Sequence, residues 1–288
     1  MSDVHRTIVT TQDHRVAGVL CSPITAQKGA PLLVCVHGGG CNGGYFDLKG
    51  ASLVQAAVGR GMAVLQIDRP GYGASAMPHN EATPIVQGAS AVHALVETVR
   101  AQPAMAQRPV ALIGHSIGGA VALTYAAQSA ETGNPPLNAV CVSGIGDRPA
   151  AAVTGFSRYN RTEMTVEPPA DWFFGPEGTY SWKGVMALRA IAEPWRTDEV
   201  DEVIRDWPGR VAEVAGAITC PVHFRLAEFE RIWENDADAL RRISEAFTRT
   251  SVNAAILPEG GHLYEVHRRG AELIAAQLDF VLAQVDRA

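Results

Sequence analysis

One serine in this chain stands in a pattern that suits a nucleophile. Residues 114–118 read Gly-His-Ser-Ile-Gly, follow an apolar run over residues 109–113 and lead into a helix-like stretch over residues 119–128. A sharp turn from strand to helix holds such a serine in a strained backbone conformation, and the glycines let strand and helix approach closely. Ser116 would then be exposed at a helix N-terminus, where the helix dipole favours developing negative charge. We therefore expect Ser116 to attack an electrophilic carbon.

Short apolar segments alternate with helix-like stretches along most of the chain, and apolar residues recur at spacings of three and four in the latter. The pattern predicts strands over residues 7–11, 15–21, 32–36, 63–67, 109–113, 139–142, 222–226 and 252–257. It predicts helices over residues 51–60, 84–100, 119–128, 236–248 and 268–285. Such alternation favours a mostly parallel sheet with helices on both faces. The first two strands have no helix between them, so we expect them to form an antiparallel hairpin at one edge.

The stretch between residues 144 and 219 breaks this alternation. It contains no convincing core strand and is rich in aromatic residues, namely Phe156, Tyr159, Trp172, Phe173, Phe174, Tyr180, Trp182, Trp195 and Trp207. Long unstructured connections are uncommon in compact domains. We therefore expect a helical lid over residues 144–219, inserted into a core formed by residues 1–143 and 220–288. The alternative is a helical cap whose aromatic residues pack only against one another.

Four segments of the chain resemble motifs of the serine α/β-hydrolase fold family. Residues 114–118 match its nucleophile elbow, and His-Gly-Gly-Gly at residues 37–40 is similar to the segment that supplies an oxyanion-hole amide. Asp-Arg-Pro-Gly-Tyr-Gly-Ala-Ser at residues 68–75 looks like the turn after the next strand. Gly-Gly-His at residues 260–262 follows the last strand, where the family places its catalytic histidine. The resemblance covers the whole chain and implies an α/β-hydrolase fold with a mostly parallel eight-stranded sheet.

These matches receive separate chemical roles. A neutral serine hydroxyl needs a base within hydrogen-bond reach, and we assign that role to His262. The oxyanion formed on attack needs preorganised donors, for which the backbone amides of Ile117 and of Gly39 or Gly40 are the candidates. We interpret His37 as structural, because a histidine in that loop can hold backbone amides through its ring nitrogens.

The acid that would orient His262 departs from the family pattern. The family usually has an aspartate after the penultimate strand, in a segment like G-x-x-D, whereas residues 227–230 read Ala-Glu-Phe-Glu. Aligning this alanine with the family glycine puts Glu230 in the acid position, and a glutamate can orient the imidazole with one more methylene to accommodate. Glu228 and then Asp147 are the alternatives.

A rival motif points to a different class of site. Residues 38–43 formally satisfy G-x-G-x-x-G after a strand, and Asp68 follows the next predicted strand, near the position of the ribose-binding acid in dinucleotide sites. Against a dinucleotide site, two predicted strands already precede this one, and residues 44–47 do not open a helix cleanly. We therefore expect no cofactor. The chain has no C-x-x-C pair and no H-E-x-x-H motif, so we expect no metal site either.

Composition and charge exclude several kinds of partner. The formal net charge is −6, and the 24 lysines and arginines are scattered, so we expect no nucleic-acid partner. Residues 1–14 lack the apolar core of a signal peptide, and no run of about 18 apolar residues suggests a membrane span. We expect a cytoplasmic protein whose buried cysteines are reduced and behave as small apolar residues.

The leading hypothesis is a serine hydrolase that cleaves an ester or lactone of an apolar or aromatic acyl substrate through an acyl-Ser116 intermediate. The lid residues Trp172, Phe173, Trp182 and Trp195 are the candidates for binding the acyl group. Thioester hydrolysis is the second hypothesis, because residues 260–264 resemble the histidine loop of editing thioesterases. Carbon–carbon bond hydrolysis and acyl or cyclising transfer use the same triad. A hypothesis of another class is a ligand-binding protein with an idle triad, which the departure at Glu230 motivates.

Overall fold

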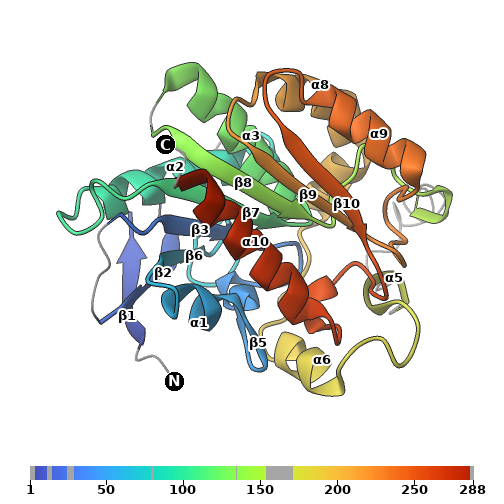
Figure 1. Cartoon of the computed structure of the whole chain (residues 1–288), viewed down its shortest axis with the longest axis horizontal. Helices are drawn as coiled ribbons and strands as arrows, with labels where there is room; N and C mark the ends of the chain where they lie inside the picture. The colour runs from blue at the N-terminus through green and yellow to red at the C-terminus, as the bar shows by residue number, and fades with distance from the viewer. Residues whose placement is uncertain are drawn as a thin grey trace.

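The computed structural model describes residues 4–11, 15–24, 29–78, 81–133, 135–153 and 171–285. Among these residues one eight-stranded sheet crosses the molecule in the order β1-β2-β6-β3-β7-β8-β9-β10 (Figure 1). Its strands are β1 (Val4–Thr10), β2 (Ala17–Pro23), β3 (Leu32–Val36), β6 (Ala63–Ile67), β7 (Val110–His115), β8 (Leu137–Ser143), β9 (Val222–Ala227) and β10 (Val252–Leu257). The predicted α/β sheet of eight strands is confirmed.

Strand direction separates one edge of the sheet from the rest. β1 pairs antiparallel with β2, and β2 pairs antiparallel with β6. All pairs from β6 to β10 are parallel. The predicted edge hairpin is confirmed. The carboxyl ends of the parallel strands all lie on the same side of the molecule. The loops that follow β3, β7, β9 and β10 are therefore close together there.

Helices cover both faces of the sheet (Figure 1). The central strands β3, β6 and β7 are buried along their whole length, as expected for nearly unbroken apolar runs between two helical layers. The main hydrophobic core packs one face against α2 (Pro84–Arg100), α3 (Ile117–Thr132), α8 (Trp207–Ala217) and α9 (Ala237–Ala246). A second core packs the other face against α1 (Leu53–Val58) and α10 (Gly270–Val285).

Four helices begin one or two residues away from the predicted positions, among them α1 and α3. The helix expected from residue 51 starts at Leu53, because the Ser52 hydroxyl accepts a hydrogen bond from the N–H of Gln55 at 2.9 Å and caps the helix there. Residues 51 and 52 instead form β5 (Ala51–Ser52), which pairs with β4 (Asp47–Leu48) after the short 3-10 helix η1 (Gly43–Phe46). The other helix, α3, begins at Ile117, immediately after Ser116.

The segment over residues 144–219 leaves the sheet after β8 and returns to it at β9. Its described residues form no strand of the sheet and contain α5 (Asp171–Phe174), α6 (Trp182–Arg189), α7 (Thr197–Asp201), the π-helical turn η2 (Glu202–Asp206) and α8. Phe156 and Tyr159 lie outside the described residues. Trp207, at the start of α8, is buried and donates its indole N–H to the carbonyl of Gly146 at 2.9 Å. The division into core and lid stays a prediction.

The described part of the chain contains no helix with the length and apolar character needed to cross a membrane. All five cysteines are buried and free of disulfide bonds. Burial raises the pKa of Cys21 to about 11 and that of Cys220 to about 12, so these thiols are protonated and pack as small apolar groups.

His223 is a buried histidine between β9 and α10. Its ring lies 5.3 Å from that of Phe280, and neither ring nitrogen has a hydrogen-bond partner among the described residues. Burial lowers its pKa to about 3, and the nearby charge of Arg225 acts in the same direction. The usual histidine pKa is about 6.5. As the pH falls, the unfolded chain binds a proton at this histidine before the folded protein does. His223 therefore does not lower the free energy of unfolding above about pH 6.5, and it lowers that free energy progressively as the pH falls towards 3.

We predict that His223→Leu flattens the acid side of the stability curve. The variant should gain roughly 1–2 kcal/mol in unfolding free energy, relative to the wild type, between about pH 6.5 and pH 5. Urea denaturation at both pH values measures the difference. The control His93→Leu changes an exposed histidine on α2 and should keep the wild-type pH dependence. Parallel curves for His223→Leu and the wild type would contradict the assignment.

Candidate active site

Ser116 occupies a sharp turn between β7 and α3. Its backbone has φ 54° and ψ −127°, a conformation that residues with a side chain rarely adopt and that the surrounding structure must maintain. A Cβ atom on Gly118 would lie 2.1 Å from the carbonyl oxygen of Val36, and one on Gly114 would lie 2.5 Å from the carbonyl oxygen of Gly118. The two glycines are therefore needed for strand and helix to approach each other beside Ser116.

His262 and Glu230 form a hydrogen-bonded line with Ser116. The Nε2 atom of His262 lies 3.0 Å from the Oγ atom of Ser116. On the other side of the ring, Nδ1 lies 2.8 and 3.1 Å from the two carboxylate oxygens of Glu230. An ionised carboxylate only accepts, so Nδ1 donates its hydrogen to Glu230 and Nε2 is left to accept from the hydroxyl. This is the arrangement that an activated serine requires.

The loop after β9 holds Glu230 in place. Its carboxylate accepts the backbone N–H groups of Arg231 at 3.1 Å and Ile232 at 3.0 Å, and the side chain is fully buried. His262 lies in the loop after β10, which is the parallel neighbour of β9. The adjacent carboxyl ends of these two strands thus bring the carboxylate and the imidazole together.

The other two candidate acids have different partners. The carboxylate of Glu228 accepts the backbone N–H of Glu259 at 2.8 Å, which joins the turns after β9 and β10. Asp147 accepts hydrogen bonds from the guanidinium of Arg242 at 2.7 and 3.2 Å. Of the three carboxylates, Glu230 is the one that the structure places against His262.

The glycine loop after β3 borders the turn at Ser116. A Cβ atom on Gly38 would lie 3.1 Å from the Cβ of Ser116, and one on Gly39 would lie 3.1 Å from the side chain of Ile117. The loop therefore faces Ser116 with its backbone. The N–H of Ile117 belongs to the first turn of α3, where amides have no partner within the helix. Loop and helix can thus both present amides beside the Ser116 hydroxyl.

Two of the four aromatic residues expected to bind substrate lie close to this site. The ring of Phe173 is 5.9 Å from that of His262 and 5.8 Å from that of Trp195. A Cβ atom on Gly39 would come within 2.6 Å of the Trp195 indole, and one on Gly40 within 2.7 Å. Trp195 therefore lies directly over the glycine loop.

The other two aromatic residues are placed elsewhere. Trp182 is 65% exposed, and its ring packs edge-on against Tyr180 at 5.8 Å. Trp172 packs against the main hydrophobic core. Their expected role in binding the acyl group stays a prediction.

A buried polar cluster beside His262 was not predicted. The ring of His115 lies 5.0 Å from that of His262 and stacks on Tyr45 at 4.9 Å, and its Nδ1 is 3.1 Å from the Ser143 hydroxyl oxygen. Tyr45 donates its hydroxyl to Glu265, whose carboxylate lies 3.9 Å from Nδ1 of His115. Burial raises the pKa of Glu265 and lowers that of His115 well below its usual range. An uncharged ring therefore lies against His262.

The sequence offers one weak signal for this cluster. Glu265 follows His262 by three residues and lies in the 3-10 helix η3 (Tyr264–Val266). Its partner Tyr45 is 220 positions away in the chain. Sequence spacing alone therefore cannot bring the two side chains together.

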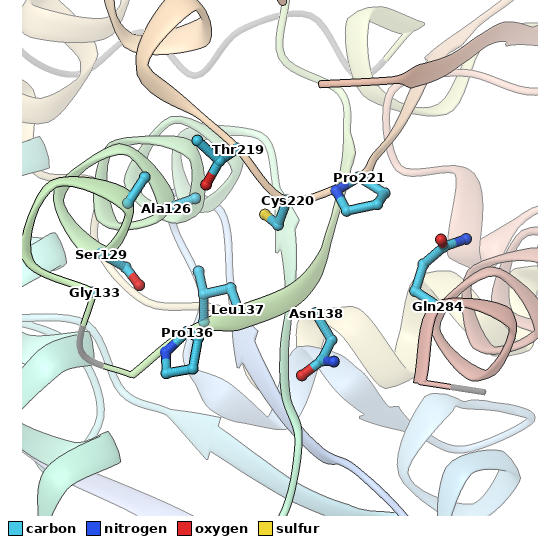
Figure 2. A pocket seen from close by; sticks show the side chains of 11 residues that line it. Ala126, Ser129, Gly133, Pro136, Leu137, Asn138, Thr219, Cys220, Pro221 and Gln284 are labelled. Carbon is cyan, nitrogen blue, oxygen red and sulfur yellow. The ribbon is translucent and has the colours of Figure 1, made fainter. Parts of the chain in front are cut away.

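Two cavities bordered by described residues lie away from Ser116. The first, of about 360 Å³, is bordered by residues that precede or begin β8 and β9, among them Leu137, Asn138 and Cys220 (Figure 2). These are the amino ends of parallel strands, whereas Ser116 lies at a carboxyl end. The second, of about 340 Å³, lies between α8 and α9. We therefore place the chemistry at the hydrogen-bonded line and not at either cavity.

Across the described ranges, no three histidine, cysteine, aspartate or glutamate side chains gather in a way that could hold a metal ion. The residues around Ser116 are suited instead to acid–base and nucleophilic chemistry.

Residues 33–276 match the sequence model of the alpha/beta hydrolase family. The match covers most of the chain, so the chain belongs to this family, which places it among hydrolases. No curated protein matches the chain by sequence.

Solved structures of hydrolases share the fold. The chain is similar to a highly thermostable carboxyl esterase from Bacillus coagulans, with a TM-score of 0.72, 16% identity, and coverage of 99% of this chain and 100% of that one. It is similar to a putative lipase from Acinetobacter baumannii AYE, with a TM-score of 0.69, 14% identity, and 99% and 93% coverage. It is also similar to 2-hydroxy-6-oxo-6-phenylhexa-2,4-dienoate hydrolase from Rhodococcus sp. strain RHA1, with a TM-score of 0.67, 14% identity and 100% coverage of both chains.

The position of Glu230 generates a prediction about the reactivity of Ser116. Glu230→Gln removes the charge that keeps Nδ1 protonated and stabilises the imidazolium, so labelling of Ser116 by a fluorophosphonate should slow by about 10²- to 10⁴-fold. The labelling rate is measured with a fluorescent fluorophosphonate in reactions that are quenched at successive times. Glu228→Gln is the matched control two residues away and should stay within about threefold of the wild type. Equal, mild effects at both positions would mean that neither glutamate supports His262.

Proposed function

We propose that this protein is a serine hydrolase that cleaves an ester or lactone of an apolar or aromatic acyl substrate through an acyl-Ser116 intermediate. The observation that carries the proposal is the line of hydrogen bonds from the Ser116 hydroxyl through His262 to Glu230. The order of the three residues in the chain is the order that the nucleophile-elbow motif has in α/β-hydrolases.

The proposed reaction runs in two halves. His262 accepts the Ser116 proton as Oγ attacks the substrate carbonyl, and the resulting imidazolium is stabilised by the Glu230 carboxylate. The imidazolium then donates that proton to the leaving alcohol, and the acyl-serine is formed. In the second half a water molecule gives its proton to His262 and attacks the acyl carbon. The released acid leaves with the bond to Oγ broken, and Ser116 regains its proton.

The negative charge that develops on the carbonyl oxygen needs donors already in position. The backbone amides of Ile117 and of the glycine loop are the candidates, because both adjoin Ser116 and α3 points its N-terminus at the site. Donors of this kind act without reorganisation at the moment of reaction, which is why their loss is costly.

Two aromatic rings support an apolar or aromatic acyl group. Phe173 lies beside His262, and Trp195 covers the glycine loop. Both come from the segment proposed as the lid, so that segment would form one wall of the acyl site. The other expected acyl-binding residues, Trp172 and Trp182, remain predictions.

We predict that wild-type protein turns over at least one member of a small ester panel and that Ser116→Ala does not. The panel comprises p-nitrophenyl esters of increasing chain length, an aryl ester, a lactone and an acyl-thioester. The small hydroxyl can be removed with little effect on folding, so the thermal unfolding midpoint should be unchanged. Product release followed spectroscopically measures turnover. Turnover that survives in Ser116→Ala would remove Ser116 from the mechanism.

The panel also separates the alternatives. A preference for the thioester would favour a thioesterase. One structurally similar protein is the thioesterase domain from the curacin biosynthetic pathway. A folded protein that labels with a fluorophosphonate but turns over no panel member would favour carbon–carbon bond hydrolysis or acyl transfer. A folded protein that neither labels nor turns over would favour a ligand-binding role.

We predict that Phe173→Ala weakens the preference for long or aromatic acyl groups. Loss of a partly buried aromatic ring costs about 1.5–3 kcal/mol of apolar contact, so kcat/KM for the preferred ester should fall roughly 10- to 100-fold. Turnover of p-nitrophenyl acetate should change by less than about threefold. Trp182→Ala is the matched control, because its ring is exposed. Equal losses on the acetate and on the preferred ester would mean that Phe173 does not select the acyl group.

A further inference from the structure

Three donor groups lie close to the carbonyl oxygen of Gly38. Its oxygen lies 2.7 Å from Nδ1 of His37 and 3.0 Å from an Nη atom of Arg69, and the Cys41 thiol approaches it at 3.6 Å. The peptide unit is planar and trans, so the N–H of the next residue points in the opposite direction from this oxygen. Fixing the Gly38 carbonyl therefore fixes the direction of the Gly39 N–H.

This peptide unit is the part of the loop that adjoins the nucleophile. An added Cβ on Gly38 would contact the Cβ of Ser116, and one on Gly39 would contact the side chain of Ile117. Of the two expected loop donors, the amide of Gly39 is the one that shares its peptide unit with the Gly38 carbonyl, so this amide is held beside Ser116.

The hydrogen-bond partners of the His37 ring determine its tautomer. Its Nε2 accepts the backbone N–H of Arg69 at 3.0 Å, so its hydrogen resides on Nδ1 and is donated to the Gly38 carbonyl. Burial and the charge of Arg69 lower the pKa of His37 well below its usual range. The ring is therefore a neutral positioning group.

Arg69 is the centre of the clamp, and its charge is entirely buried. Its Nε donates to the His37 carbonyl at 2.8 Å, and the guanidinium forms two hydrogen bonds to Glu199 of α7. Both side chains are 1% exposed. Tyr72 donates its hydroxyl to the same carboxylate at 2.8 Å. A buried guanidinium without a counter-charge is strongly unfavourable, so Arg69 depends on Glu199 to keep its place.

We propose that Arg69 and Glu199 are positioning residues of the oxyanion hole. Through the Gly38 carbonyl they aim the Gly39 amide at the developing oxyanion, and through Glu199 the helix α7 of the 144–219 segment becomes a structural part of the catalytic apparatus. The inference rests on the proposed function for its catalytic consequence. The clamp itself is a property of the fold and can be measured separately.

The test compares Glu199→Gln with Glu202→Gln in the full chain. Glu202 is also buried in this segment, where its carboxylate accepts hydrogen bonds from Arg210 and from the backbone N–H of Ile85, and among the described residues none of its hydrogen bonds or ion pairs involves the glycine loop. Glu199→Gln should lower kcat on the best panel ester about 10- to 100-fold while KM stays within about twofold, because an oxyanion donor acts in the transition state. Glu202→Gln should change kcat by less than about threefold.

A second readout does not depend on turnover. Hydrogen exchange followed by mass spectrometry on peptides that cover residues 37–44 should show at least about tenfold faster exchange in Glu199→Gln, and unchanged exchange in Glu202→Gln. If Glu199→Gln does not fold, Tyr72→Phe takes its place. That change removes one donor to Glu199 and should lower kcat about two- to fivefold with the same local gain in exchange.

The outcomes separate this inference from the proposed function. Unchanged exchange at residues 37–44 in Glu199→Gln, or equal losses of kcat in both glutamine variants, would overturn the clamp. Faster local exchange with unchanged kcat would leave the clamp without a role in catalysis and would overturn the proposal as well. A wild type that neither turns over the panel nor labels with a fluorophosphonate would refute the proposed hydrolysis, and the exchange readout would still decide whether Glu199 holds the loop.

Discussion

The strained backbone of Ser116 is the constraint on which the rest of the site depends. A residue with φ 54° is held there only because β7, α3 and the loop after β3 pack so closely that a side chain on Gly118 would collide with the Val36 carbonyl. The same packing sets the Ser116 hydroxyl at the edge of the sheet, beside the glycine loop and the start of α3. The neighbouring groups can then be fixed relative to one atom.

Buried charged and polar side chains hold the groups around Ser116 in position, and each has a hydrogen-bond or ion-pair partner on another element. Glu230 receives two backbone amides as well as the imidazole of His262. Arg69 divides its donors between two loop carbonyls and Glu199. Such groups are costly to bury without partners, so their geometry is specific rather than adaptable. The environment of Ser116 is therefore preorganised, which is what electrostatic stabilisation of a transition state requires.

The segment over residues 144–219 has two kinds of contact with this site. Phe173 and Trp195 bring apolar rings to His262 and the glycine loop. Glu199 reaches Arg69 from the same segment, and this contact is buried and ionic. The first kind suits the recognition of an acyl group, and the second suits the stability of the loop. Under the proposed function, this segment would couple substrate binding to the geometry of the glycine loop.

The sequence by itself determined the fold class, the strands and the position of Ser116 in a strand-to-helix turn. Residues 32–36 and 63–67 were predicted as strands and form β3 and β6 with these bounds, because buried parallel strands leave nearly unbroken apolar runs in the sequence. The elbow glycines are recognised from a local motif, although the contact that requires Gly118 is with Val36 on another strand. The helix at residues 51–60 was predicted too long, because the cap at Ser52 was overlooked.

Only the tertiary structure decided which side chains meet. Glu228, Glu230 and Asp147 were all chemically suitable acids, and their different partners follow from the ends of β8, β9 and β10, which no spacing encodes. The pair of Arg69 and Glu199 spans 130 positions, and the cluster around Glu265 spans 220. Contacts at such separations are set by the packing of whole elements. The motifs therefore pointed to Ser116, His262 and Glu230, and the packing of the fold is what brings these three side chains together and separates Glu228 and Asp147 from them.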